Sequence, residues 1–195
     1  NRKVDEIHLI AVSTMQFWHG YDRLIEGMRE YYKQNVVKKK VILHLVGGGI
    51  EEKNYKKLAK KYNLEDYIIF EGFLDGKELD DLYEQCQIAI GSLGIHRIDD
   101  KLKVSSLKLK EYVAHGLPVV IAGYSDIKQK ETRKYILSFR NDETAILIDR
   151  IVKFYNRIFE NENTENLHQK VRDTFKNTCD INQVFKPVLD YLEEK

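Results

Sequence analysis

The sequence contains little cysteine and no long apolar segment. Its two cysteines, Cys86 and Cys179, lie far apart and form neither a CxxC pair nor a Cys/His ligand spacing. This usage favours a reducing, cytoplasmic setting over a disulfide framework. No apolar run approaches the length of a membrane span, and no secretory signal opens the chain. We therefore expect a soluble, cytoplasmic protein.

The sequence also lacks an excess of charge of either sign. Its 32 Lys and Arg residues nearly cancel its 31 Asp and Glu residues, which leaves a formal charge of +1. This balance gives no global attraction for nucleic acid, which we do not expect as a partner. With 195 residues, 43% of them apolar and 32% charged, the composition indicates one globular domain with a sizeable core.

Two glycine-rich patterns that bind phosphates are missing as well. The stretch Gly47-Gly48-Gly49 contains Gly-x-Gly, but Glu52 stands where a dinucleotide-binding loop has its third glycine. The stretch also follows the second predicted strand instead of the first, and the chain has no Gly-Lys-Ser/Thr of a P-loop. These departures argue against NAD. The plain alternative is a tight turn before the next helix.

What the sequence does contain is an alternation of short apolar runs with amphipathic segments. The apolar runs predict buried strands at 7–13, 41–46, 67–70, 87–90, 119–122 and 135–139. The amphipathic segments predict helices at 21–32, 51–62, 75–83 and 105–115, and further C-terminal helices at 145–159, 167–175 and 184–192. Together they predict an α/β fold: a Rossmann-like, doubly wound parallel sheet of about six strands with right-handed crossovers and C-terminal helices.

The stretch over 103–122 predicts an anion site within this fold. Ser105 and Ser106 offer hydroxyl groups at the start of a helix that is followed by a buried strand. The N-terminus of such a helix collects partial positive charge and unpaired N–H groups. Glu111 lies about one turn inside the helix and can reach a neutral polyol beside the anion. The plain alternative for Glu111 is a solvated ion pair with Lys108, three residues earlier.

Five stretches, in this order, resemble the C-terminal, donor-binding domain of GT-B glycosyltransferases. The closest type is the large retaining, family-4-like family called glycosyl transferases group 1. The stretches are GYDRLIEG at 20–27, LVGGG at 45–49, IFEGF at 69–73, LDDLY at 79–83 and KLKEYVAHGLPVV at 108–120. Each is weak alone, but their order and spacing agree with the family pattern.

The resemblance implies that the donor is a nucleotide-diphosphate sugar, such as a UDP-, GDP- or ADP-sugar, bound without a metal or other cofactor. Glu111 matches the family glutamate that hydrogen-bonds the ribose hydroxyls. Ser105, Ser106 and Leu107 match the helix start whose N–H groups hold the diphosphate. No catalytic residue is assigned, because the resemblance covers donor binding only.

Loops that leave the carboxyl ends of the strands complete the expected donor site. Ligands of doubly wound sheets bind beyond these ends. Gly48 lies in such a loop, where the missing side chain permits close backbone approach to a ligand. The resemblance places the base of the nucleotide against Phe73 and Leu74.

Three positions depart from the family pattern. Lys103 stands where the family has a second glutamate that faces the transferred sugar, and Thr14 and His19 stand where an arginine and a lysine often grip the phosphates. A protonated His19 can replace part of this charge, or the ring can simply pack beside Trp18. Thr14 can only hydrogen-bond. Arg97 is a further candidate contact to phosphate or sugar, with an ordinary surface arginine as the alternative.

The resemblance thus implies a hexosyltransferase-type enzyme that transfers a sugar, with retention, to a polysaccharide such as a capsule or to a lipid-linked acceptor. We expect residues 1–195 to form the single donor-binding domain, with the N-terminal acceptor domain absent from this chain and the fragment inactive alone. Two alternatives stay open: a non-catalytic nucleotide-binding or interaction module, and a sugar-nucleotide epimerase. An epimerase needs acid and base carboxylates, against which Lys103 argues.

A lysine-rich face on the second predicted helix also allows two interpretations. It can lie against anionic lipid, which would suit a peripheral membrane contact with a lipid-linked acceptor. It can equally be a solvated face, because the same helix carries acidic residues and surface lysines are common. The lysines are Lys53, Lys56, Lys57, Lys60 and Lys61.

Overall fold

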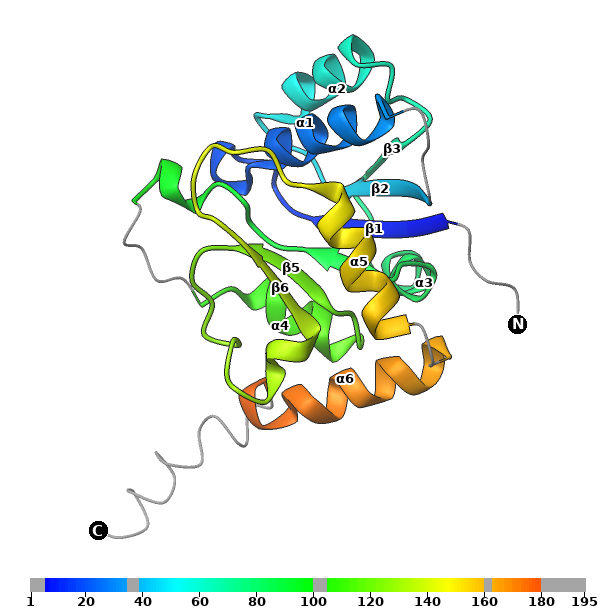
Figure 1. The fold of residues 1–195 in the computed structure, drawn as a ribbon, viewed down its shortest axis with the longest axis vertical. Helices are drawn as coiled ribbons and strands as arrows, with labels where there is room; N and C mark the ends of the chain where they lie inside the picture. Colours follow the sequence, from blue (N-terminus) through cyan, green and yellow to red (C-terminus); the bar gives the residue numbers. More distant parts are fainter. Residues whose placement is uncertain (1–5, 35–38, 100–104, 160–162, 180–195) are drawn as a thin grey trace, which may run out of the picture.

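The computed structural model describes residues 6–34, 39–99, 105–159 and 163–179, and within them a single sheet of six parallel strands (Figure 1). The strands are β1 (Glu6–Val12), β2 (Lys40–Val46), β3 (Ile68–Gly72), β4 (Ile88–Ile90), β5 (Val119–Ala122) and β6 (Ile136–Phe139). Their order is β3-β2-β1-β4-β5-β6, which confirms the Rossmann-like, doubly wound fold. Lys103 and the helix expected over 184–192 lie outside the described residues.

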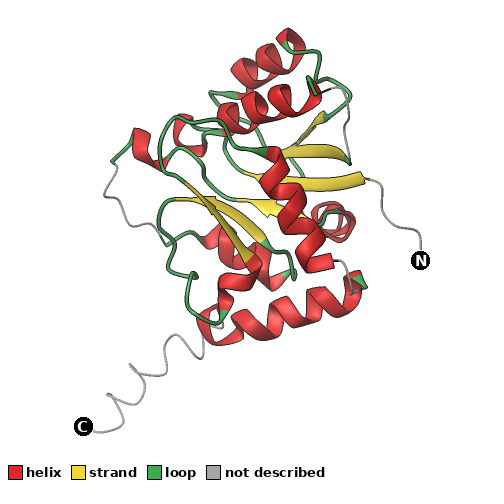
Figure 2. Ribbon diagram, viewed as in Figure 1, coloured by secondary structure: helices red, strands yellow, loops and turns green. Residues whose placement is uncertain are grey.

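Helices cover both faces of the sheet, as Figure 2 shows in red around the yellow strands. One face packs against α1 (Tyr21–Tyr32), α2 (Glu52–Lys61) and α5 (Ile148–Phe159). The other face packs against α3 (Gly76–Gln85), α4 (Leu107–Ala114) and α6 (Thr164–Cys179). Short 3₁₀ turns, η1 (Phe17–His19), η2 (Ile95–Arg97) and η3 (Thr132–Tyr135), lie in the loops.

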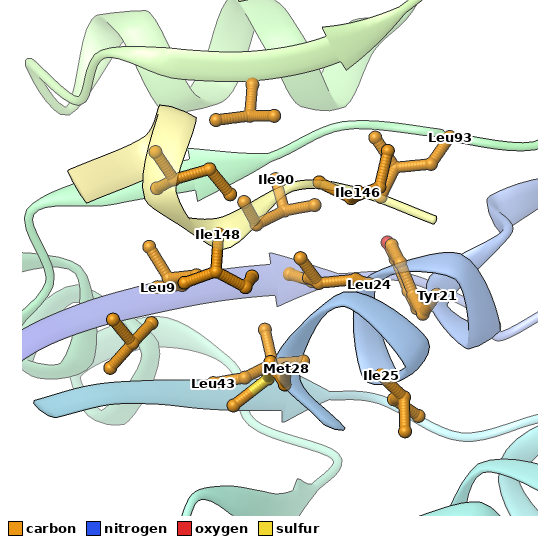
Figure 3. Close-up of a cluster of buried hydrophobic side chains, with 14 of the residues drawn as sticks. Leu9, Tyr21, Leu24, Ile25, Met28, Leu43, Ile90, Leu93, Ile146 and Ile148 are labelled. Carbon is orange, nitrogen blue, oxygen red and sulfur yellow. The ribbon is translucent and has the colours of Figure 1, made fainter. Parts of the chain in front are cut away.

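The strands are mostly apolar because both faces of the sheet are covered, and β4 (Ile88–Ile90) and β5 (Val119–Ala122) are wholly so. Successive side chains of a strand point to opposite faces, so that Leu9 of β1 joins one core cluster and Ile10 the other. Figure 3 shows Leu9 surrounded by Leu24 and Met28 of α1 and by Ile148 of α5. The run of β-branched and leucine residues that predicts the strand therefore also builds the two cores.

The prediction of a helix over 145–159 is wrong at its start. The helix α5 begins at Ile148, and Ile146 lies buried in an extended segment that crosses α1. The N–H of Ile146 donates to the carbonyl of Arg23 at 3.0 Å. Gly27 makes room for this crossing, since a Cβ there would lie 1.8 Å from the Ile146 oxygen. A short apolar run fits either a buried helix or an extended segment, so periodicity did not separate them.

The loops after β1 and β4 meet where the strand order reverses. The N–H of Leu93 donates to His19 O at 2.8 Å, and the N–H of Gly94 donates to Trp18 O at 3.2 Å. Gly20, with φ +64°, allows this contact because a Cβ at Gly20 would lie 2.5 Å from the Gly94 nitrogen. The backbone of the two loops is thereby locked together at the switch point of the sheet.

Candidate functional site

A hollow of about 310 Å³ lies at the switch point. Its walls come from the loops after β1, β4 and β5 and from the start of α4. The lining residues are Trp18, His19, Ser92, Ile95, Ser106, Lys108, Leu109, Ile121, Ala122 and Tyr124. Ligands of open doubly wound sheets bind in this crevice, beyond the carboxyl ends of the strands. Of the predicted site residues, His19 and Ser106 line it directly.

A larger hollow, of about 660 Å³, lies away from these strand ends, between the C-terminal parts of α1 and α2. Arg29 and Lys33 line it, but each already has a carboxylate partner. Arg29 Nη1 lies 3.1 Å from Glu26 Oε2, and Lys33 Nζ lies 3.4 Å from Glu30 Oε1. Because these cations are paired and the hollow is distant from the switch point, the smaller hollow is the better candidate.

The start of α4 borders the smaller hollow, which Ser106 and Lys108 line. Ser106 is the residue before the helix and has an extended backbone, and its side chain makes no capping bond. The first turn of a helix leaves N–H groups without intrahelical partners, here including that of the exposed Leu107. Ser105 is held away from this role, since its Oγ donates to Asp126 at 2.7 Å and accepts from Lys110 at 3.0 Å.

Glu111 is held by a tyrosine and not by a cation. Tyr83 Oη donates to Glu111 Oε1 at 2.9 Å, and the Tyr83 ring stacks on His115 with 4.3 Å between ring centroids. Burial, followed by the nearby charge of Glu111, raises the pKa of Tyr83, so its hydroxyl stays protonated. The expected alternative, an ion pair with Lys108, is not formed, because Lys108 turns toward Tyr21.

His19 carries a neutral ring. Its Nδ1 accepts the N–H of Gln16 at 2.8 Å, which leaves the proton of the neutral imidazole on Nε2. Burial and, next, the charge of Lys108 lower the pKa of His19 to about 3. The ring stacks on Tyr21 and lies 5.9 Å from the Trp18 ring. The structure therefore favours the packed loop histidine over the protonated one, and His19 can offer a ligand only a neutral hydrogen-bond donor.

Arg97 uses its guanidinium group within the protein. It donates to both carboxylate oxygens of Asp22, at 2.9 and 2.7 Å, and to both of Glu143, at 2.9 and 2.6 Å. It also donates to the carbonyl of Phe17 at 2.9 Å. The bonds from Arg97 to Glu143, followed by one from His96, lower the pKa of Glu143 to about 2. Arg97 thus joins η2 to α1, and its guanidinium group is already occupied, which argues against a phosphate contact.

The other predicted site residues lie in the loops after β1, β2 and β3. Thr14 is exposed. Gly48 lies between two glycines that pack against the loop after β1. An added Cβ would lie 2.1 Å from the Ser13 oxygen at Gly47 and 1.8 Å from the Thr14 oxygen at Gly49. Phe73 is 82% exposed, whereas Leu74 packs against the core beneath α3 and α4. These residues share the carboxyl edge of the sheet with α4, but they do not line the hollow.

Lys108 is the charged residue among the lining residues that the sequence pattern did not assign to the site. Within α4 it lies next to Leu109 and four residues before Tyr112, and both of these are buried. This spacing places Lys108 on the inward face of the helix. The signal is present in the sequence, because Lys108 lies between the apolar residues Leu107 and Leu109, but the same position also fits a solvated partner of Glu111.

Within the described ranges, no group of three or more His, Cys, Asp or Glu side chains could hold a metal ion. No helix of the same ranges is long and apolar enough to cross a membrane. The lysines of α2 are exposed, and one of them, Lys56, pairs with Glu52 at 2.6 Å.

Solved structures share this fold at low sequence identity. Sucrose-phosphate synthase from Thermosynechococcus elongatus matches with a TM-score of 0.68 and 20% identity, over 98% of this chain and 45% of that one. Anabaena HepE in complex with UDP-glucose matches with a TM-score of 0.68 and 14% identity, over 97% and 49%. The catalytic domain of cholesterol-α-glucosyltransferase from Helicobacter pylori matches with a TM-score of 0.58 and 19% identity, over 88% and 99%.

The chain therefore spans less than half the length of the first two of these proteins. A comparison with curated protein sequences gives no match. The family described as glycosyl transferases group 1 matches residues 1–183, which is most of the chain. With its doubly wound sheet and its hollow at the switch point, the chain belongs to the glycosyl transferases group 1 family and has the Rossmann-like fold of GT-B glycosyltransferases.

Proposed function

We propose that this chain is the nucleotide-diphosphate-sugar-binding domain of a metal-independent glycosyltransferase. The observation that carries the proposal is the placement of Glu111, which Tyr83 orients on α4 one turn beyond the unpaired amides at the hollow. An exposed carboxylate that one neutral hydroxyl holds keeps its second oxygen for a ligand. It suits a ribose, whose hydroxyl groups donate hydrogen bonds to carboxylates.

In this proposal the diphosphate lies against the start of α4. The N–H groups of Leu107 and the next residue, together with the helix dipole, stabilise the negative charge that develops on the departing diphosphate. This is the electrostatic task that a metal ion performs elsewhere. Transfer with retention at the anomeric carbon follows from the family resemblance, and we assign no residue of this chain to the bond-breaking step.

A UDP-sugar is the first donor to test, because HepE, a structural neighbour, was solved with UDP-glucose. The chain covers 49% of that protein, which supports a division of labour between two domains. We propose that residues 1–195 bind the sugar donor and that another domain binds the glycan or lipid-linked acceptor. This chain alone should then bind nucleotide but transfer no sugar. GDP- and ADP-sugars remain the alternatives for the donor.

For the whole enzyme we propose a cytoplasmic location with a peripheral membrane contact. The exposed lysines of α2 support it, because a lysine-rich helix face is attracted to anionic lipid. Co-sedimentation with vesicles that contain anionic lipid tests this part. Equal sedimentation with neutral vesicles would contradict an electrostatic contact.

Isothermal titration of the chain with UDP, GDP and ADP tests the donor site. We expect one of them to bind, and Glu111→Ala to weaken that binding by about 10-fold or more, the usual cost of losing a hydrogen bond to a charged group. Glu65→Ala, which removes an exposed carboxylate after α2, is the matched control and should bind like the unaltered chain. No binding of any nucleotide, or equal binding by Glu111→Ala, would contradict the site.

One observation favours a second candidate, a non-catalytic nucleotide-binding module of the same fold. The neutral ring of His19 means that the loop after β1 brings no charge to the hollow. The test is turnover of a sugar-nucleotide panel by the full-length protein. Tight nucleotide binding without hydrolysis or transfer of any sugar would select the module over the enzyme.

A further inference from the structure

Among the described residues that line the hollow at the switch point, Lys108 of α4 is the one cationic side chain. Lys108 lines the hollow, and its Nζ lies 3.4 Å from Tyr21 Oη and 5.8 Å from the centre of the Tyr21 ring. The lysine is thus held by a neutral hydroxyl and an aromatic face. Both groups fix the position of the ammonium without neutralising it.

Among the described residues, no carboxylate pairs with Lys108. The comparison with Lys110, two residues further along the same helix, makes the difference clear. Lys110 lies 3.3 Å from Asp126 Oδ2 and donates to Ser105, so its charge is compensated within the protein. A buried charge normally has a partner, because its burial is otherwise unfavourable. An unpaired lysine that lines a hollow is therefore a candidate for an external anion.

The surroundings of Lys108 agree with this assignment. Burial alone lowers the pKa of Lys108 to about 7, so that the side chain is close to losing its proton at neutral pH. In the part of the chain that the structure describes, the titratable groups around it are His19 from η1, Tyr21 from α1 and Tyr124 from the loop after β5. Neither His19 nor Tyr21 carries a negative charge at neutral pH, given the lowered pKa of His19 and the raised pKa of Tyr21.

The same hollow offers several donors to an anion. The first turn of α4 borders it and leaves N–H groups without intrahelical partners, Ser92 and Ser106 are lining residues with hydroxyl groups, and His19 retains Nε2–H. The volume of about 310 Å³ lies within the size range of small-ligand sites. A diphosphate that enters would meet neutral donors, and Lys108 is the one described lining residue able to compensate its charge.

We propose that Lys108 is the cation that binds the diphosphate of the donor nucleotide, and that it takes up a proton from solvent when the nucleotide binds. The inference rests on the proposed function, because it names how that site holds its ligand. The step is a simple protonation, in which the neutral amine and a solvent proton become the ammonium that pairs with a phosphate oxygen. An adjacent anion favours the protonated form and drives the uptake.

Titration calorimetry with UDP, in two buffers that differ in ionisation enthalpy, measures this proton directly. At pH 8.5 we expect an uptake of about one proton per bound UDP, and at pH 6 an uptake near zero, because Lys108 is by then already protonated. Lys108→Met should abolish the uptake and weaken binding by about 10- to 100-fold. Lys108→Arg should bind within about threefold of the unaltered chain but without uptake, since arginine is always charged.

Lys110→Met is the matched control, because it removes a paired lysine from the same helix. It should leave the proton uptake unchanged and alter the Kd by less than about threefold, as for a partly exposed charge. Unweakened binding by Lys108→Met, or full proton uptake by Lys108→Arg, would overturn the assignment to Lys108 while the proposed function stands.

Inorganic pyrophosphate separates the remaining cases. If no nucleotide binds but pyrophosphate binds with the same dependence on Lys108, the proposed function is wrong. Lys108 would then still bind an anion, but one smaller than a nucleotide. If neither pyrophosphate nor any nucleotide binds the unaltered chain, both the proposed function and the assignment of Lys108 are wrong.

Discussion

Arg97 and Asp22 form a two-point ion pair that joins the loop after β4 to the first turn of α1. Arg97 Nη1 lies 2.9 Å from Asp22 Oδ1, and Nη2 lies 2.7 Å from Oδ2. Both side chains are partly buried beside the switch point, where the loops after β1 and β4 already share backbone hydrogen bonds. The pair therefore braces the two loops that enclose the candidate site.

Loss of this pair should lower stability without unfolding the chain. We expect Asp22→Asn and Arg97→Lys each to reduce the free energy of unfolding by about 1 kcal/mol. This value is at the upper end for partly exposed ion pairs, because the geometry is bidentate. Urea denaturation of both variants and of the double variant gives the coupling energy. The exposed pair of Lys77 and Asp81 is the control, and Asp81→Asn should change stability little. A coupling energy near zero would contradict the brace.

Gly20 should be more sensitive to substitution than another glycine of similar backbone conformation. Gly20 has φ +64°, and a Cβ added there would lie 2.5 Å from the Gly94 nitrogen. Gly72 has φ +72°, but a Cβ added there would have no neighbour within 4 Å. Gly72→Ala should therefore cost about 1–2 kcal/mol for the left-handed conformation alone, and Gly20→Ala clearly more, because the clash adds to it. Denaturant titration measures both values, and equal losses would show that the loops can move apart.

The neutral state of His19 should make stability depend on pH in acid. Its pKa of about 3 in the folded chain lies below the usual 6.5, so the unfolded chain binds more protons between these values. Stability should be full above pH 6.5 and fall as pH drops toward 3, by up to about 1.4 kcal/mol per pH unit for one proton. His19→Asn retains an acceptor for the Gln16 N–H and cannot titrate. Its unfolding curve should fall less steeply with pH, and parallel curves would contradict the assignment.

Lys108→Met should stabilise the ligand-free chain. The pKa of Lys108 is about 7 when folded against the usual 10.5, so its burial as a cation is unfavourable below pH 7. This penalty fades as pH rises from 7 toward 10.5, because the folded chain no longer carries the charge. The Tm of the variant should exceed that of the unaltered chain at pH 6 and approach it at pH 10. A lower Tm at pH 6 would show that Lys108 stabilises the apo fold.

Tyr83 should act as a positioning residue for Glu111. Tyr83→Phe removes the hydroxyl that donates to Glu111 and should weaken UDP binding by about 3- to 10-fold, which is less than the effect of losing the carboxylate. The loss should shrink with 2′-deoxyuridine diphosphate, which lacks one ribose hydroxyl. Calorimetry with both nucleotides measures this difference. Equal losses for the two would mean that Tyr83 acts through the fold and not through the ribose.

Much of the fold could be predicted from the chain because the information is local. The apolar runs of β1 and β5 and the amphipathic pattern of α1 (Tyr21–Tyr32) are visible in stretches of a few residues. The start of α4 was also predictable from its hydroxyl residues, although the Ser106 side chain makes no capping bond in the structure. The exception is the segment before α5, where the partner of Ile146 is the carbonyl of Arg23, more than a hundred residues earlier.

The sequence by itself determined the alternating strands and helices, the family and the helix start that suits an anion, since these depend on residue type and spacing. Only the tertiary structure decided which side chains carry charge at the site. Arg97 is occupied by Asp22 and Glu143, His19 is neutral, and Lys108 is unpaired within the described residues. Charge state depends on burial and on partners distant in sequence, and both are set when the loops after β1 and β4 meet α4.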